Sequence, residues 1–185
     1  MKRSFIALFL AIALVAVAPA QARKTVLSPN KMSAIASPVD KRDSRLLIHF
    51  ELPKEMLDEK AIVDFATLHI KAQVSDAAMA QIDVFAVATD WQSAGSVSWD
   101  RPWTQAGGDI VAETAPSIYS LKSESGLKEM AIDVTELVRS WKAGKLANNG
   151  ILMTISKDDL LIDKPSVAFN LDDIAMRVFY SIEYK

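Results

Sequence analysis

The sequence predicts an all-β domain, either a sandwich or a barrel, with one short α-helix packed at the edge of its core. Apolar and polar residues alternate in several short segments, and turn residues separate these segments. One further segment repeats its apolar residues with helical spacing. A chain of 185 residues is long enough for one domain of ordinary size.

Alternation is clearest in residues 45–52 and 66–74, and each segment has the pattern of a half-buried strand. The predicted inner faces carry Leu46, Ile48, Phe50 and Leu52 in the first segment and Ala66, Leu68, Ile70, Ala72 and Val74 in the second. The predicted outer faces carry Arg45, Leu47, His49 and Glu51, and then Thr67, His69, Lys71 and Gln73.

A third strand is expected over residues 81–89, where the alternation slips near Phe85, which indicates a bulge or burial on both faces. Later β-like stretches are residues 96–99, 110–113, 128–132, 150–156 and 176–184. Pro53 ends the first strand, and residues 53–60 form a polar link or a short helical turn.

The helix is expected within residues 133–144, where the apolar residues Val134, Leu137, Val138 and Trp141 follow helical spacing. Asp133 and Glu136 resemble a capping box, and Gly144 is placed to end the helix. A sandwich with this helix over one end of the core accounts for all the patterns.

Residues 1–22 resemble a secretory signal peptide. Lys2 and Arg3 precede an apolar run over residues 5–18, and Ala20 and Ala22 suit a cut before Arg23. The alternative is an uncleaved anchor, but the run of 14 residues is shorter than the about 17–25 that span a bilayer. We therefore expect a protein that is secreted, periplasmic or at the cell surface, without a membrane span after cleavage.

Residues 23–43 contain Pro29 and Pro38 and lack a clear period, so a weakly structured segment or one irregular edge strand is expected there. The domain itself is expected over residues 44–185. The chain has 21 basic and 23 acidic residues and no cysteine, which argues against nucleic acid as a partner and excludes disulfides and thiol chemistry.

The order of several short motifs resembles the DNRLRE, or disaggregatase-related, family of exported microbial proteins, which is compared with carbohydrate-binding modules. The matching pieces are residues 45–53, 62–70, Trp91 with 97–99, 132–138 with Trp141, 149–152, and a last strand closing on Tyr184. The chain departs from the family in a shorter segment 23–43 and in residues 169–175, which replace the usual closing motif. The resemblance implies a β-sandwich of jelly-roll type with a non-catalytic role, binding polysaccharide or holding surface material together.

A basic patch of Arg45, His49, His69 and Lys71 would form if the strands 45–52 and 66–74 paired, because all four lie on the predicted polar faces. Such a patch would suit an acidic glycan such as a uronate polymer. The alternative is a solvated sheet face, and two histidines without a third ligand are weak evidence for a metal.

Three tryptophans, Trp91, Trp99 and Trp103, lie close together in the sequence. Sugar rings stack on aromatic faces, so Arg101 and Trp103 are candidate ligand contacts. The alternative is that Trp91 and Trp99 belong to the core, as Trp141 is expected to do.

No cofactor is expected, except that the pairs Asp158–Asp159 and Asp172–Asp173 would suit a structural calcium ion if they were not simply solvated turns. The sequence lacks the usual hydrolase, zinc-protease and phosphate-loop motifs, and His49 or Tyr119 as a lyase base has no supporting context. The sequence thus predicts an exported, non-catalytic module that binds polysaccharide, with an acidic glycan as the candidate ligand. The alternative is a structural or adhesion protein acting through protein contacts.

Overall fold

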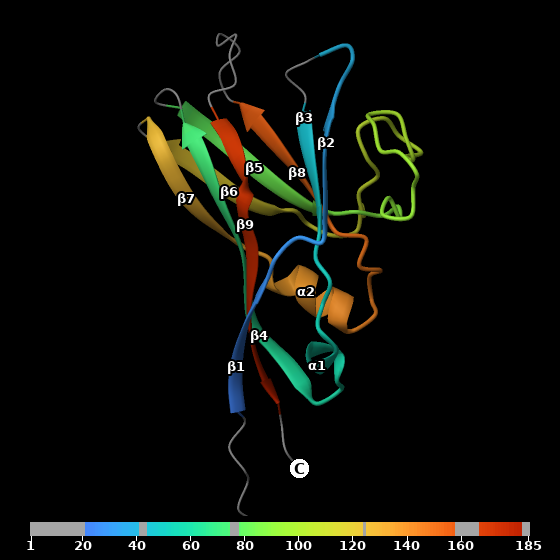
Figure 1. Ribbon diagram of the computed structural model, residues 1–185, viewed down its shortest axis with the longest axis vertical. Helices are drawn as coiled ribbons and strands as arrows, with labels where there is room; N and C mark the ends of the chain where they lie inside the picture. Colours follow the sequence, from blue (N-terminus) through green and yellow to red (C-terminus); the bar gives the residue numbers. More distant parts are fainter. Residues whose placement is uncertain (1–20, 41–43, 75–77, 124, 158–166, 183–185) are drawn as a thin grey trace, which may run out of the picture.

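Two antiparallel sheets pack face to face in the computed structural model, which describes residues 21–40, 44–74, 78–123, 125–157 and 167–182 (Figure 1). Sheet A contains, in spatial order, β1 (Gln21–Leu27), β9 (Val167–Ile182), β4 (Ala61–Val74) and β7 (Gly126–Asp133). Sheet B contains β2 (Lys31–Ala36), β3 (Ser44–His49), β8 (Ile151–Lys157), β5 (Ala78–Ala86) and β6 (Ser117–Ser123). The protein is an all-β sandwich, as predicted.

The strand order is that of a jelly roll. Only the pairs β2–β3 and β5–β6 follow one another within a sheet, and every other strand is followed by one in the opposite sheet. With the additional edge strand β2 set aside, the two sheets have the orders β1-β9-β4-β7 and β3-β8-β5-β6. These orders place sequentially distant strands side by side, as the two Greek keys of a jelly roll do.

The main core lies between the two sheets. The alternation in β4 buries Ala66, Leu68, Ile70, Ala72 and Val74, as the sequence predicts. They pack with inward residues of the other strands and with Trp141 of helix α2 (Thr135–Lys142). Because the same period leaves every second residue of β4 outside, the strand presents a row of polar side chains on the outer face of sheet A.

Helix α2 lies within the predicted segment 133–144, and its ends follow the expected rules with one change. Asp133 Oδ1 accepts hydrogen bonds from the Thr135 N–H at 2.9 Å and from Thr135 Oγ1 at 2.6 Å. The predicted capping box is wrong, because Glu136 pairs instead with Arg139 Nη1 at 2.6 Å. Gly144, at φ 66°, ends the helix in a left-handed conformation.

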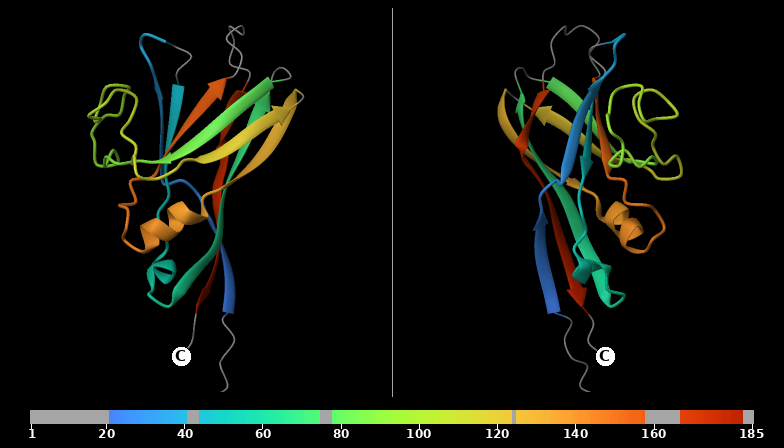
Figure 2. Two further views of the ribbon diagram at one scale, coloured as in Figure 1. Left: turned by 180° about the vertical axis from the view of Figure 1, so that it is seen from behind. Right: turned by 45° about the vertical axis from the view of Figure 1, so that its right-hand side comes forward.

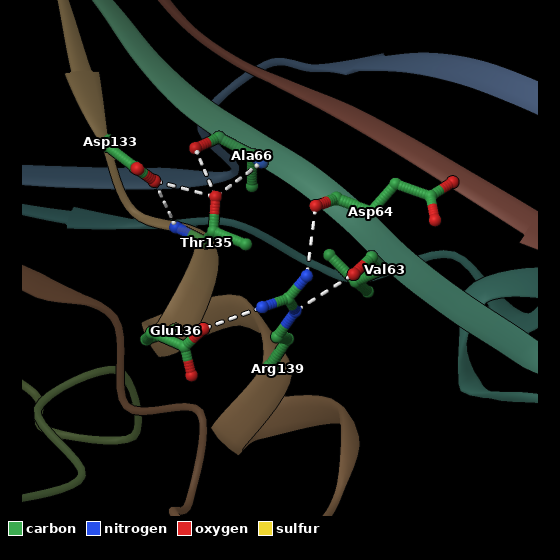
Figure 3. Close-up of polar contacts among 7 residues, drawn as sticks. All are labelled: Val63, Asp64, Ala66, Asp133, Thr135, Glu136 and Arg139. Atoms are coloured by element: carbon green, nitrogen blue, oxygen red, sulfur yellow. Dashed lines mark hydrogen bonds and ion pairs between the residues drawn. The ribbon is translucent and has the colours of Figure 1, made fainter.

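The helix also completes the edge of sheet A. β7 pairs with β4 only from Thr67 onward, so the first part of β4 lacks a strand on that side. Here Thr135 Oγ1 accepts the Ala66 N–H at 3.0 Å, and Arg139 donates to the carbonyls of Val63 at 2.9 Å and Asp64 at 3.0 Å (Figure 3). The helix therefore satisfies backbone groups that an absent strand would otherwise pair.

The lower part of sheet A extends beyond sheet B, and α2 and the short helix α1 (Lys54–Leu57) lie beside it (Figures 1 and 2). α1 falls in the predicted link 53–60 and buries Met56. Among the described residues, no helix has the length and apolar character needed to cross a membrane.

The structure corrects several predictions of secondary structure. Residues 23–43 contribute to two regular edge strands, β1 and β2, instead of at most one irregular strand. Residues 96–99 and 110–113 form loop, apart from a single bridge between Val87 and Ile110. β6 was not expected. It is an edge strand rich in polar residues and its Ile118 is exposed, so it lacks the apolar alternation that marks a half-buried strand. Residues 1–20 of the predicted signal peptide lie outside the described residues, and Gln21 and Ala22 begin β1.

Candidate ligand-binding face

The predicted basic patch does not form. Arg45 and His49 lie on β3 in sheet B, whereas His69 and Lys71 lie on β4 in sheet A. β3 pairs with β2 and β8, and β4 pairs with β9 and β7. The link between β3 and β4 crosses from one sheet to the other, so the two polar faces point away from each other.

The outer face of β3 is covered rather than solvated. The 87–110 loop lies against the outer side of sheet B (Figure 2). It contributes to a second apolar cluster with the residues Ile35, Leu47, Val87, Trp91, Trp103 and Leu152. Phe85 packs on this cluster, whereas its neighbour Val84 is buried in the main core, which confirms burial on both faces near residue 85.

The tryptophans of the loop hold it to the sheet. Trp91 is fully buried and its Nε1 donates to the Asn149 carbonyl at 2.7 Å. Trp103 is only 8% exposed and donates to the Ser98 carbonyl at 2.8 Å, so it cannot serve as a stacking platform for a sugar. The predicted contact between Trp103 and a sugar is wrong. Arg101 is exposed, and it makes no cation–ring contact with any of the described residues.

Arg45 is likewise engaged by the loop. Its guanidinium lies 4.8 Å from the ring centroid of Trp99, and Nη1 donates to the Gly107 carbonyl at 2.9 Å. Asp109 closes the loop by accepting hydrogen bonds from Thr89 and from the Thr104 and Gln105 N–H groups. Burial raises the pKa of Asp109, but these hydrogen bonds to the carboxylate outweigh it, so the pKa is lowered overall.

His49 is a structural residue at the junction of three segments. Its side chain is buried, with Nδ1 2.6 Å from Asn30 Oδ1 and Nε2 3.1 Å from the Asn148 carbonyl. Burial lowers the pKa of His49 because it disfavours the charged imidazolium, although the Asn148 carbonyl acts in the opposite direction. His49 is therefore neutral near pH 7 and joins the β1–β2 link to the start of β8.

Acidification is expected to destabilise the protein before its carboxylates titrate. Burial lowers the pKa of both His49 and His69, so between their folded values and the ordinary value of 6.5 the unfolded chain binds more protons than the folded one. The free energy of unfolding should fall as the pH is lowered from about 7.5 to about 5. Urea titrations at several pH values across this range measure the change. In the variant with both His49→Gln and His69→Gln, the free energy of unfolding should depend less on pH. A stability that is flat or that rises on acidification in the wild type would contradict the expectation.

The remaining candidates, His69 and Lys71, line a polar hollow on the outer face of sheet A. The hollow has a volume of about 360 Å³. Its lining residues are Ser28, His69, Ile70, Lys71, Glu129, Asp172, Asp173, Ile174, Ala175 and Arg177. They come from β4, β7 and β9 and from the residue that follows β1.

A large bulge in β9, formed by residues 171–174, creates the hollow. The register between β4 and β9 changes from His69↔Ala175 to Lys71↔Asn170, so residues 171–174 lie opposite the single residue Ile70. The bulge places Asp172 and Asp173 at the hollow, while Ile174 remains in the core. Ala175 and Ala131 flank His69 in the register and leave space on both sides of its ring. Bulges often re-aim side chains beside binding sites.

The polar pairs of the hollow lie at ion-pair distance but beyond hydrogen-bond distance. Lys71 Nζ lies 3.5 Å from Asp173 Oδ2, His69 Nδ1 lies 3.6 Å from Glu129 Oε1, and Arg177 Nη2 lies 3.8 Å from the same oxygen. These distances exceed the about 2.7–3.2 Å of a hydrogen bond.

The imidazole of His69 is the least satisfied group in the hollow. Its Nδ1 is buried without a hydrogen-bond partner in the described part of the chain, while its Nε2 lies 3.0 Å from Thr67 Oγ1. Burial lowers the pKa of His69, and the Arg177 charge lowers it further, so the imidazole is neutral near pH 7.

Two exposed phenylalanines lie on the same face. Phe65 of β4 and Phe179 of β9 are partners in the register and are 44% and 38% exposed. Lys24 Nζ lies 5.6 Å from the ring centroid of Phe179. We call Phe65 and Phe179 the aromatic pair. Val26 and Ile62 are also exposed and extend the apolar surface beside it.

The sequence contained only part of this site. The alternation in residues 176–184 places Arg177 and Phe179 on one face, but Glu129 and the bulge at residues 171–174 had no recognisable signal. Among the described residues, no group of three or more acidic or histidine side chains could hold a metal ion. Asp158 and Asp159 lie outside the described residues, and Asp173 contacts Lys71 and Asn170 Nδ2.

Comparisons with known proteins add little to this description. The sequence matches no protein-family model, and no curated protein is significantly similar to it. The chain resembles the coat protein of Tobacco streak virus with 11% identity and a TM-score of 0.33, over 88% of this chain and 87% of that one. It also resembles the K1 cleaved adhesin domain of Lys-gingipain from Porphyromonas gingivalis with 10% identity and a TM-score of 0.26, over 89% of this chain and 99% of that one. At these values neither structure bears on function.

Proposed function

We propose that this chain is an exported, non-catalytic module that binds polysaccharide in the polar hollow of sheet A. The observation that carries the proposal is the set of three polar pairs held at 3.5–3.8 Å around the hollow. Two join opposite charges, Lys71 with Asp173 and Arg177 with Glu129, and the third joins the neutral His69 imidazole to Glu129. A sugar hydroxyl both donates and accepts hydrogen bonds. It can therefore bridge a cation and a carboxylate that stand slightly too far apart to bond each other.

Two further features support a sugar as the ligand. The aromatic pair offers exposed ring surface on the same face as the hollow, on which a sugar ring can stack while its hydroxyls remain hydrated. The resemblance of the motifs to the DNRLRE family points to the same class of ligand. The export of the protein rests on the pattern of residues 1–22, and the non-catalytic role rests on the lack of known catalytic motifs.

The alternative function is that of a structural or adhesion protein acting through protein contacts. The apolar surface formed by Val26, Ile62, Phe65 and Phe179 favours it, because grouped apolar side chains mark interaction surfaces. The polar hollow beside this surface favours the sugar ligand, since a protein contact would leave its charges poorly paired.

Glycan-array binding is expected for the wild-type protein and is expected to be lost on replacing Lys71 or Arg177. Each of Lys71→Ala and Arg177→Ala removes a charged hydrogen-bond donor, which corresponds to about 1.5–3 kcal/mol, or at least a tenfold weaker affinity. Arg101→Ala is the matched control, because Arg101 is an exposed arginine on the 87–110 loop, which covers sheet B. Thermal melts should show all three variants folded. The proposal fails if the wild type binds no glycan, or if Arg101→Ala weakens binding as much as Lys71→Ala does.

A further inference from the structure

We propose that the ligand of this face is an uncharged, extended glycan chain that lies along β4 and β9, with hydroxyls in the polar hollow and a ring on the aromatic pair. This inference rests on the proposed function and names the class of polysaccharide and its direction on the sheet.

The charge of the hollow favours a neutral ligand. Its cations are Lys71 and Arg177, and its carboxylates are Glu129, Asp172 and Asp173. Outside the hollow the same face carries both Lys24 and Asp133, so cations do not predominate on it. Each ring of a uronate polymer would bring a carboxylate close to Glu129 or Asp173, and that repulsion would offset the attraction of the cations. The expectation of an acidic glycan depended on the basic patch, which the topology does not form.

The length of the site favours a chain over a single sugar. The outward residues of β4 and their partners on β9 form a series of rungs, which the β9 bulge interrupts before the last one: Phe65 with Phe179, Thr67 with Arg177, His69 with Ala175, and Lys71 with Asn170. At about 3.3 Å per residue, Phe65 and Lys71 are about 20 Å apart along the strand, which exceeds the length of one hexose ring. A ligand that contacts both ends of this series must therefore contain several rings.

The sizes of the side chains that project from the sheet along this series also fit an extended ligand. Ala175 and Ala131 lie on either side of His69, so the surface is low at the hollow, and the exposed rings of the aromatic pair lie at the other end. A chain lying along the strands can place one ring on the aromatic pair and reach the separated charge pairs with the hydroxyls of later rings. A chain lying across the strands would contact only one of the two features.

Calorimetric titration with oligosaccharides of increasing length tests the inference. The probes are oligomers of one to six units from xylan, cellulose and β-1,3-glucan, with oligogalacturonate as the acidic series. For at least one neutral series, we expect the affinity to rise at least tenfold between the monosaccharide and the longest oligomer. We expect it to change by less than about twofold between about 50 mM and about 500 mM salt, because a neutral ligand is not subject to charge screening.

The variant with both Phe65→Ala and Phe179→Ala separates the two ends of the site. It should lose most of the gain with length and keep the weak binding of the shortest oligomers, since Lys71 and Arg177 remain. Ile118→Ala is the control, because Ile118 is an exposed apolar side chain on β6 in the other sheet, sheet B.

The outcomes distinguish this inference from the proposed function. Preference for oligogalacturonate with steep salt dependence, or an affinity independent of length, overturns the uncharged extended chain and leaves glycan binding in place. Binding of no oligosaccharide in any series overturns both. Retention of the full length dependence in the double phenylalanine variant also overturns the inference, because the aromatic pair would then have no part in binding.

Discussion

Replacing Trp91 with alanine is expected to lower the free energy of unfolding by about 3–5 kcal/mol. Trp91 is fully buried in the second apolar cluster, between the 87–110 loop and sheet B. Its removal leaves a cavity, frees the Asn149 carbonyl from its bond to Nε1, and removes the ring that lies 5.3 Å from Lys31 Nζ. Chemical denaturation followed by far-ultraviolet circular dichroism measures the change.

Trp99→Ala is the matched control for this prediction. Trp99 belongs to the same loop but is only partly buried, and its main specific contact is with the Arg45 guanidinium at 4.8 Å. Its loss should cost about 1–2 kcal/mol, the range for a partly desolvated cation–π contact with some lost burial. Equal losses for the two variants would show that the loop does not form a second core over Trp91.

Replacing Gly150 with alanine is expected to destabilise the protein by at least about 3 kcal/mol, since a steric clash adds to a strained backbone. Gly150 has a φ of 86°, and a Cβ at this position would lie 2.5 Å from the Ile48 carbonyl oxygen and 3.2 Å from His49 Cα. The obstacle is backbone of the neighbouring strand β3, which cannot move without disturbing its pairing with β8.

Gly95→Ala tests whether this cost is specific to the position. A Cβ on Gly95 meets no atom within 4 Å, so the change should shift the free energy of unfolding by no more than about 0.5 kcal/mol. Differential scanning calorimetry of both variants makes the comparison. A melting temperature for Gly150→Ala close to that of the wild type would mean that β3 and β8 do not approach each other as described.

Local patterns in the sequence predicted the strands and the helix better than they predicted which other segments cover these elements. The alternation of residues 66–74 and the helical spacing of residues 133–144 depend only on which side chains face the core, and both predictions are confirmed. In residues 45–52 the same alternation identified the strand but not its outer face. Leu47 is buried there by the 87–110 loop, and His49 is buried at its contacts with Asn30 and Asn148. No local period can indicate a covering segment that lies about 40 residues away in the sequence.

The candidate site was predicted only in part, because it depends on pairing between distant strands. His69 and Lys71 were expected on an exposed polar face, and they line the hollow. Their partners were expected from β3, whereas the crossing connection places β7 and β9 beside β4 instead. Asp172 and Asp173 appeared to be a turn because the bulge in β9 interrupts the alternation that would have identified a strand.

The most direct test of the account is to map the bound sugar on the isotopically labelled protein by nuclear magnetic resonance. Backbone amide shifts are recorded while the tightest-binding oligosaccharide from the array is added. If the sugar binds in the polar hollow, the largest changes fall on outward residues of sheet A around it, namely His69, Lys71, Glu129, Ala175 and Arg177. Changes confined to the 87–110 loop, or the absence of any change with all the array glycans, would contradict it.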